Sequence, residues 1–409
     1  MPQWLLDTIG TLLGVGPSVT IVLWGYVWYR VEQSSREIPT LRAGEALAEA
    51  QPPTGRVCVV VPAWNEARSI AALIRSLRAE TYPDLRVVLA LDRCTDASPQ
   101  LAQAAIAGDD RFEIVAIDAC PEQWAGKVHA VHAGVTRSRG AADAEFLLFA
   151  DADTTFSPGC IAAALALMRE RRLDLLSLLS TLTYDAWFER VAQMAASFEL
   201  MRQYPLQLAN AQDHRRAFAN GQFMLFRKGA YDAIGGHEAV KGALLEDLAL
   251  ARLIEATRRR AGVFIAAGLF RCRMYATWAE FRRGWKRIFT EAANRKPRRL
   301  SQLAWRIRIL GTIVPAWTLV ACAAVVPVMA RDAGLGWRLA GFCLPALVIW
   351  LGALLRIAAL ARAPAWTAPL HIAGAWITAG LYDEAAADLR RSKPTSWGGR
   401  EYDLTTDQV

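Results

Sequence analysis

The chain has 409 residues, a formal net charge of +8 and 54% hydrophobic residues, including 15 Trp. This length fits one large domain or two ordinary ones, and the apolar composition indicates that part of the chain resides in a membrane. A basic excess fits nucleic acid, anionic lipid or a phosphorylated substrate. The sequence has no aromatic and basic motif typical of nucleic-acid binding, which favours the other two partners. The seven scattered cysteines exclude a Cys-x-x-Cys metal cluster and favour a reducing compartment.

Residues 1–29 are predicted to form an N-terminal transmembrane helix. The stretch from Trp4 to Trp28 has Asp7 as its only charged residue, and about 20 apolar residues span a bilayer. Three arginines follow it, at positions 30, 36 and 42. By the positive-inside rule, the next part of the chain lies in the cytoplasm. Residues 30–55 are polar and proline-containing, which predicts a linker with one short helix.

Residues 56–275 are predicted to form one α/β domain. Short apolar runs at 57–61, 85–91, 112–117 and 146–150 predict four strands, and residues 69–78 have helical periodicity. Strands that alternate with helices favour a parallel sheet.

The strand at 146–150 leads directly into Asp151-Ala152-Asp153. Ligands of open α/β sheets bind beyond the carboxyl ends of the strands, where this acidic pair falls. Two carboxylates there suit Mg²⁺ or Mn²⁺ holding a diphosphate. A solvated turn, or a cap for the helix after Pro158, is the alternative.

Polar residues follow two further predicted strands. Pro62 is expected to end the first strand, which places Asn65 and Glu66 at the sheet edge, where a base or ribose can be held. Asp92 ends the second strand and can accept a hydrogen bond from a base. A loop with a helix cap is the alternative interpretation of these residues.

Residues 276–308 are predicted to form a basic amphipathic helix. Residues 271–308 carry twelve basic and two acidic residues, and the aromatic residues recur at three- and four-residue steps. Trp278, Phe281, Trp285 and Phe289 therefore share one helical face. This pattern suits a helix lying on a cytoplasmic membrane surface, and an amphipathic helix packed on the domain is the alternative.

Residues 309–382 are predicted to contain the C-terminal membrane segments. The stretches 310–330 and 337–360 are long enough to span a bilayer. The shorter stretch 366–381 is open to three interpretations: it spans, re-enters or lies flat. The tail, residues 383–409, contains Arg390, Arg391, Lys393 and Arg400, which favours the cytoplasm.

Several of these motifs together resemble the family 2 glycosyltransferases. The matching residues are Val61-Pro62-Ala63-Trp64-Asn65-Glu66, Asp92 with Thr95-Asp96, Gly126-Lys127, Asp151-Ala152-Asp153, Gly235-Gly236 and Leu245-Glu246-Asp247. Their order and spacing extend over residues 56–287. The resemblance implies a nucleotide-diphospho-sugar-binding domain of the GT-A type, with a mixed α/β sheet.

The resemblance also implies roles for single residues. Glu66 and Asp92, with Pro62 and Asn65 beside them, would bind the nucleotide of a UDP-sugar. Lys127 would lie near its phosphates, Asp151 would support the sugar-nucleotide, and Asp153 would ligate Mg²⁺ or Mn²⁺. Asp247 would be the base that deprotonates the acceptor, with Glu246 adjacent to it, and the sugar would be transferred with inversion. From the sequence alone, a helix cap is the alternative role of Asp247.

One departure from the family pattern concerns the acceptor. Many membrane-bound members carry Gln-x-x-Arg-Trp, and the corresponding stretch here is Phe281-Arg282-Arg283-Gly284-Trp285. Trp285 matches, and Arg282 or Arg283 is a candidate phosphate contact. The chain thus looks more like lipid-glycosylating members, such as ceramide glucosyltransferase and hopanoid- or carotenoid-associated enzymes. Residues 396–402 of this chain also resemble the C-terminal end of those enzymes.

The sequence therefore predicts an integral membrane glycosyltransferase of a bacterial-type inner membrane, with its catalytic domain in the cytoplasm. It would transfer a sugar from a UDP-sugar to a membrane lipid. The alternatives are a processive polysaccharide synthase and a catalytically inactive scaffold of the same fold. The sugar and the lipid stay open, and a protein partner cannot be predicted from the sequence.

Overall fold

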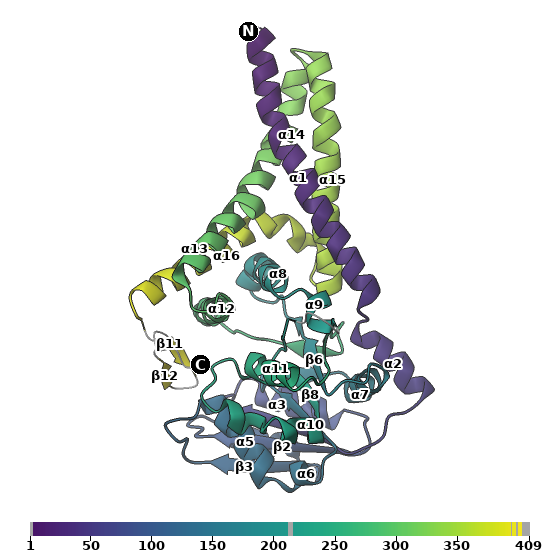
Figure 1. The fold of residues 1–409 in the computed structure, drawn as a ribbon, viewed down its shortest axis with the longest axis vertical. Coiled ribbons are helices and arrows are strands. Elements are labelled where there is room, and N and C mark those ends of the chain that lie inside the picture. Colours follow the sequence, from purple (N-terminus) through teal and green to yellow (C-terminus); the bar gives the residue numbers. More distant parts are fainter. Residues whose placement is uncertain (1–2, 212–215, 394, 398–399, 403–409) are drawn as a thin grey trace.

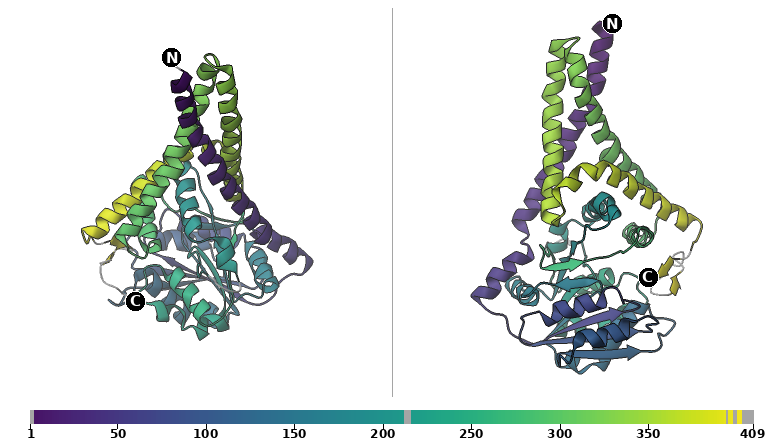
Figure 2. Two further views of the ribbon diagram at one scale, coloured as in Figure 1. Left: turned by 45° about the horizontal axis from the view of Figure 1, so that its top comes forward. Right: turned by 180° about the vertical axis from the view of Figure 1, so that it is seen from behind.

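A computed structural model describes residues 3–211, 216–393, 395–397 and 400–402. A broad α/β domain lies at one end of the molecule, and three long helices form a narrow stalk at the other (Figure 1). The N-terminal end of the chain and the turn between helices α14 and α15 lie together at the far end of the stalk (Figures 1 and 2).

The domain is built on a seven-stranded mixed sheet with the strand order β3-β2-β1-β4-β8-β6-β9. Its strands are β1 Val57–Ala63, β2 Leu85–Asp92, β3 Phe112–Ile117, β4 Phe146–Ala150, β6 Leu175–Leu179, β8 Phe223–Arg227 and β9 Ala261–Ile265. Strand β8 is antiparallel to both β4 and β6, and the other neighbours are parallel. The predicted parallel arrangement of the first four strands and the mixed sheet are both confirmed.

Pro62 does not end the first strand, contrary to the expectation. Strand β1 continues to Ala63, which pairs with Leu91 of β2. On its other side, β1 pairs with β4 only as far as Val60. Proline is tolerated in a strand where its missing N–H would face an unpaired side, and Pro62 lies beyond the last pair with β4.

Helices cover both faces of the sheet and enclose two apolar clusters. One cluster includes residues of α3 Ile70–Arg78, α4 Ser98–Ile106 and α7 Cys160–Glu170, and the other includes residues of α5 Gly126–Arg137, α10 Lys228–Ala233 and α11 Glu246–Ala256. A short helix α6 Arg139–Ala142 follows α5. A small second sheet lies beyond the carboxyl end of β4. Its strands, in order, are β5 Thr154–Phe156, β10 Phe270–Cys272 and β7 Thr181–Leu182.

Three helices in the described part of the chain are long and apolar enough to cross a membrane: Trp4–Glu37, Pro297–Met329 and Ala333–Ala361. The first is α1 Gln3–Glu37, which continues past the predicted boundary at residue 29 and leads to α2 Leu41–Ala50. The second joins α13 Pro297–Ile307, η3 Arg308–Ile313 and α14 Val314–Met329 in one continuous helix, and the third is α15 Ala333–Ala361.

The expectation of one interfacial helix over residues 276–308 is wrong. The segment forms two helices, α12 Trp278–Ala292 and α13, separated by Asn294 and Arg295 with φ of 55° and 53°. The aromatic face of α12 is buried in protein, because Phe281 packs 5.2 Å from Phe188 and Phe289 stacks 4.0 Å from Tyr382. Residues distant in the sequence cover this face, so it is not available to lipid.

Helix η2 Gly236–Val240 packs on α5 and α11 within the sheet domain. The helices between the stalk and the sheet domain are η1 Glu189–Gln193, α8 Met194–Gln203, α9 Leu206–Asn210, η4 Ala365–Leu370 and α16 His371–Arg390 (Figure 1). Helix α16 covers the stretch whose membrane role the sequence left open. It runs across the base of the stalk (Figure 2) and is not among the three candidate spans. The short strands β11 Thr395–Trp397 and β12 Arg400–Tyr402 follow it, and residues 398–399 of the tail motif lie outside the described residues.

Candidate active site

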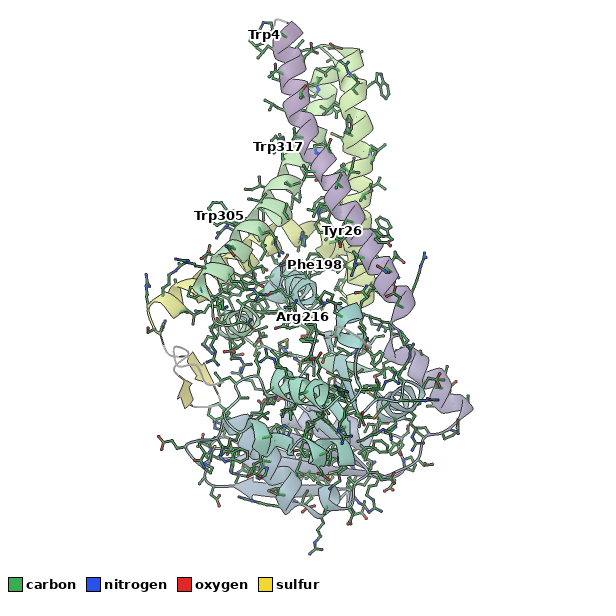
Figure 3. All side chains as sticks on the ribbon, in the orientation of Figure 1. Trp4, Tyr26, Phe198, Arg216, Trp305 and Trp317 are labelled. Carbon is green, nitrogen blue, oxygen red and sulfur yellow. The ribbon has the colours of Figure 1, made fainter. Side chains whose placement is uncertain are left out.

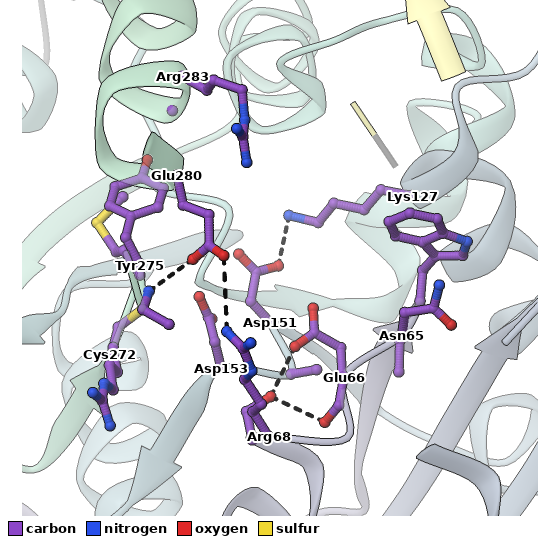
Figure 4. Close-up of a pocket in the computed structure, with 18 of the residues that line it drawn as sticks. Asn65, Glu66, Arg68, Lys127, Asp151, Asp153, Cys272, Tyr275, Glu280 and Arg283 are labelled. Atoms are coloured by element: carbon purple, nitrogen blue, oxygen red, sulfur yellow. Dashed lines mark hydrogen bonds and ion pairs between the residues drawn. The ribbon is translucent and has the colours of Figure 1, made fainter. Parts of the chain in front are cut away.

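A cleft of about 1530 Å³ opens at the carboxyl ends of strands β1, β2 and β4. Its floor is the sheet edge with the loops after these strands, and helix α12 and the end of α16 form the opposite wall (Figure 4). The predicted site residues that line it are Pro62, Asn65, Glu66, Asp92, Lys127, Asp151, Asp153 and Arg283. The structure therefore brings together residues from five separate parts of the chain.

Asp153 lies on the floor without a hydrogen-bond partner for its buried Oδ1 atom. Burial, and then the charges of Asp151 and Glu66, raise the pKa of this carboxyl to about 8. The Cys272 thiol donates a hydrogen bond to Asp153, and the Arg273 N–H donates one to its main-chain oxygen at 3.0 Å. A buried carboxylate oxygen without a partner is costly unless a cation joins it.

Among the described residues, no group of three or more His, Cys, Asp or Glu side chains has the arrangement of a complete metal site. Two carboxylates and the diphosphate of a substrate are nevertheless sufficient protein and substrate ligands for Mg²⁺, which keeps several waters. The open oxygen of Asp153 next to Asp151 fits such an ion, so the donor set agrees with the predicted role of Asp153.

Lys127 forms a bridge between Asp151 on the floor of the cleft and Glu246. Its Nζ atom lies 2.6 Å from Asp151 Oδ1 and 2.7 Å from Glu246 Oε1. Lys127 stands in the first turn of α5, and Glu246 begins α11. Burial opposes the ammonium charge, but the two carboxylates outweigh it and raise the pKa of Lys127. For Glu246, Lys127 overcomes the effect of burial and lowers the pKa.

Asp247 lies next to this pair, in the first turn of α11. Its Oδ2 accepts a hydrogen bond from the Gly221 N–H at 2.8 Å, and its Oδ1 accepts one from the Leu248 N–H at 2.7 Å. Burial and the nearby charge of Glu246 raise the pKa of Asp247 to about 6. A carboxylate with a pKa near 6 is suited to general-base catalysis near neutral pH.

The residues expected to hold the nucleotide have different local roles. Glu66 accepts a hydrogen bond from Ser69 Oγ at 2.8 Å and lines the cleft. Asp92 is buried and bound by the Arg93 guanidinium at 2.6 and 2.8 Å. Asn65 has φ 55°, and its Oδ1 accepts the Thr95 N–H at 2.8 Å. Asn65 therefore ties the loops after β1 and β2 together.

Three residues of α12 were predicted to contact a phosphate or the acceptor, and one of them lies in the cleft. Arg283 points from α12 into the cleft (Figure 4). Arg282 instead binds Glu384 of α16 at 2.8 Å, and Trp285 is only 2% exposed in the core beside Phe281. The predicted contacts of Arg282 and Trp285 with a phosphate or an acceptor are thus not supported.

There is a steric explanation for Gly284 at the position where the family motif has arginine. A Cβ atom added to Gly284 would collide with the hydroxyl of Tyr275, which lies against this turn of α12. Tyr275 also packs 5.7 Å from Phe281 and lines the cleft. Tyr275 therefore occupies the space that a side chain at position 284 would need.

The sequence did not assign three further groups of the site. They are the Gly221 N–H bound to Asp247, the Cys272 thiol beside Asp153, and Arg273 in the cleft lining. Cys272 ends strand β10, and Arg273 follows it directly. Only the pairing of β10 with β5, which follows Asp153, places this strand at the floor.

The comparisons with known proteins concern the sheet domain. Residues 58–235, which lie within this domain, match the family model described as Glycosyl transferase family 2. This region is therefore a family 2 glycosyltransferase domain, and its mixed sheet agrees with the GT-A type expected from the sequence. The chain is similar to the 4,4'-diaponeurosporenoate glycosyltransferase of Staphylococcus aureus strain MRSA252, with 26% identity over 261 residues, which are 63% of this chain and 67% of that relative.

Two solved structures are similar over most of the chain. The mannosyltransferase PcManGT from Pyrobaculum calidifontis, in complex with GDP-Man and Mn²⁺, has a TM-score of 0.47 and 17% identity, covering 94% of this chain and 99% of that chain. Residues 1–349 of Staphylococcus aureus TarS, in complex with UDP-GlcNAc, have a TM-score of 0.41 and 11% identity, covering 86% and 97%.

Proposed function

We propose that this protein transfers a sugar from a UDP-sugar to a membrane lipid in one inverting displacement. The observation that carries this proposal is the Lys127 bridge, which joins Asp151 at the donor side to Glu246, the neighbour of Asp247. A donor bound over Asp151 and Asp153 would therefore have its reacting carbon near Asp247, whose carboxylate accepts two main-chain N–H groups and is not bound by Lys127.

In this proposal, the residues of the chain divide into three tasks. Glu66 and Asp92 bind the nucleotide, and Asp151 orients the sugar-nucleotide. Asp153 would hold Mg²⁺ or Mn²⁺, which as a Lewis acid would stabilise the charge on the diphosphate leaving group. Asp247 takes the proton from the acceptor hydroxyl, which is a poor nucleophile without a base. Because a single attack breaks the bond at the anomeric carbon, the configuration inverts.

A lipid acceptor is supported by two findings. Three helices long enough to span a membrane adjoin the domain, and helix α12, which forms one wall of the cleft, leads into the second of them through α13. The similar Staphylococcus aureus relative is named for a carotenoid acid, which is an apolar acceptor. With the catalytic domain in the cytoplasm of a bacterial-type cell, transfer would occur on the inner leaflet.

A direct test is transfer by detergent-solubilised protein, with a panel of radiolabelled UDP-sugars, Mg²⁺ or Mn²⁺, and a total lipid extract. We expect one discrete labelled lipid that D247N does not form. A ladder of products would instead favour a processive synthase. No product with any donor, together with no metal-dependent UDP binding, would favour the inactive scaffold.

A further inference from the structure

The most exposed tryptophan and tyrosine side chains of the stalk lie at two levels, and Trp317, which is 37% exposed, lies between them (Figure 3). At the far end of the stalk, Trp4 is 68% and Trp337 69% exposed. Nearer the sheet domain, Tyr26 is 61%, Tyr29 63% and Trp305 61% exposed (Figure 3). Tryptophan and tyrosine gather at both membrane–water interfaces, where their rings lie at the level of the headgroups.

The spacing of the two levels fits one bilayer. A helix rises about 1.5 Å per residue, so Trp4 and Tyr26 on α1 are separated by about 33 Å, close to the hydrocarbon thickness of about 30 Å. On α15, Arg356 follows Trp337 by a similar length and binds Glu32 of α1 at 2.5 Å. Residues of both α1 and α15 therefore mark the level nearer to the sheet domain.

Two further exposed tryptophans belong to the non-spanning segment η4–α16. Trp366 is 57% and Trp376 55% exposed. Each ring is joined to an arginine, because Arg190 lies 5.7 Å from the centre of Trp366 and Arg308 lies 5.3 Å from that of Trp376. Arg308 also lies 6.0 Å from Trp305 of α13, so the two exposed rings of α13 and α16 share one guanidinium.

We propose that Trp305, Trp366 and Trp376, with Arg30, Arg190 and Arg308, form a docking surface for anionic phospholipid headgroups. On this surface, η4 and the first half of α16 lie in the headgroup layer and do not cross the bilayer. The proposal does not depend on the transfer reaction, since it concerns only how the protein is seated on its membrane.

The charge of the surface identifies the partner as anionic. Arg30 and Arg190 have no acidic partner among the residues that the structure describes. Arg308 is bound to Asp383 at 2.5 Å, which leaves the rings and the other two arginines to meet the lipid. Basic residues near an anionic membrane surface are attracted to its lipid headgroups.

The depth of the surface can be measured by fluorescence quenching in nanodiscs that contain lipids brominated near the headgroup. In full-length protein, we expect W305F/W376F to lose part of the lipid-quenched emission. The matched control is W64F, because Trp64 is 38% exposed at the cleft and should contribute no lipid-quenched emission. Equal quenching of wild type and W305F/W376F would overturn the proposal, even in a protein that transfers sugar.

The lipid class is tested with mixed nanodiscs in which either phosphatidylglycerol or phosphatidylcholine carries the bromine at equal mole fraction. We expect greater quenching by brominated phosphatidylglycerol, and an R30Q/R190Q variant should bring the ratio close to one. A ratio of one in the wild type, or a ratio that this variant leaves unchanged, would refute the anionic partner. Unchanged circular dichroism of each variant controls for folding.

Discussion

The Nζ atom of Lys127 lies 2.7 Å from Oε1 of Glu246, although one begins α5 and the other α11. This contact holds the amino ends of two helices on the same side of the sheet. It also fixes the place of Asp247, since the adjacent residue on α11 cannot move without disturbing the ion pair. Glu246 is thus predicted to position the base rather than to act as one.

The first prediction concerns Asp247 as the base. Asp247→Asn should lower kcat by about 10²- to 10⁴-fold, the usual contribution of a general base. The dissociation constant for UDP with Mn²⁺ should stay nearly constant, because Asp247 acts on the acceptor. Calorimetric titration with UDP measures the second quantity, and a large loss of UDP affinity would contradict the assigned role.

The second prediction concerns pH. The base must be deprotonated, and the pKa of Asp247 is raised to about 6. We therefore expect kcat/KM to rise with pH up to about 6 and then to level off. Glu246→Gln removes a negative charge that raises this pKa, so the acidic limb should move to lower pH. If the acidic limb does not move, the charge of Glu246 does not influence the pKa of the group that this limb reports.

A third experiment addresses Asp153. Asp153→Ala should weaken Mn²⁺-dependent UDP binding by about tenfold or more, because a buried ligand of the ion would be lost. Asp143→Ala is a suitable control, since this carboxylate is 70% exposed and lies outside the cleft lining. If Asp153→Ala retained the full metal dependence of UDP binding, another residue would have to hold the ion.

Gly221 offers a test of the geometry around the base. A Cβ atom there would lie 3.1 Å from Glu246 Oε1, 3.2 Å from Asp247 Oδ2 and 3.3 Å from Lys127 Nζ. Small displacements of catalytic groups are costly, so Gly221→Ala should reduce kcat by about ten- to a hundredfold. Gly229→Ala, where the added atom meets nothing within 4 Å, should have no such effect. Equal kcat in the two variants would show that the cluster tolerates the shift.

The replaced family motif leads to a stability prediction. Gly284→Arg would restore the arginine of the motif, yet its Cβ would collide with Tyr275. Gly284→Ala already carries this clash, and we expect it to lower the free energy of unfolding by about 1–3 kcal/mol. Gly380→Ala, on α16 with open space around the added atom, is the helical control. Thermal unfolding in detergent compares them, and matched melting temperatures would rule out the steric explanation.

The sequence predicted the parts of the fold that local pattern determines. The runs that became β3 and β4 were predicted with their observed bounds, because each is short, apolar and bordered by polar residues. Strands β6 and β9 were not predicted, although Leu175–Leu179 is an equally apolar run. Strand β8 is also an apolar run, and nothing in its sequence indicates that it pairs antiparallel to β4.

The errors at the site have a common physical origin. Helical periodicity showed that α12 has an apolar face, but periodicity does not reveal which surface covers that face. Phe188 and Tyr382 cover it, and they are distant from Phe281 in the sequence. In the same way, the family resemblance implied that Lys127 lies near the nucleotide or its phosphates and gave no sign of its contact with Glu246.

The continuous helix from Pro297 to Met329 has a mechanical consequence. Its apolar part, α14, and its amino-terminal part, α13, form one helix that reaches from the stalk to the neighbourhood of α12. A helix longer than its bilayer responds to a change in bilayer thickness by tilting. A tilt of this helix would move α13 together with α12. We therefore expect the width of the cleft to change with the thickness of a bilayer that surrounds this helix.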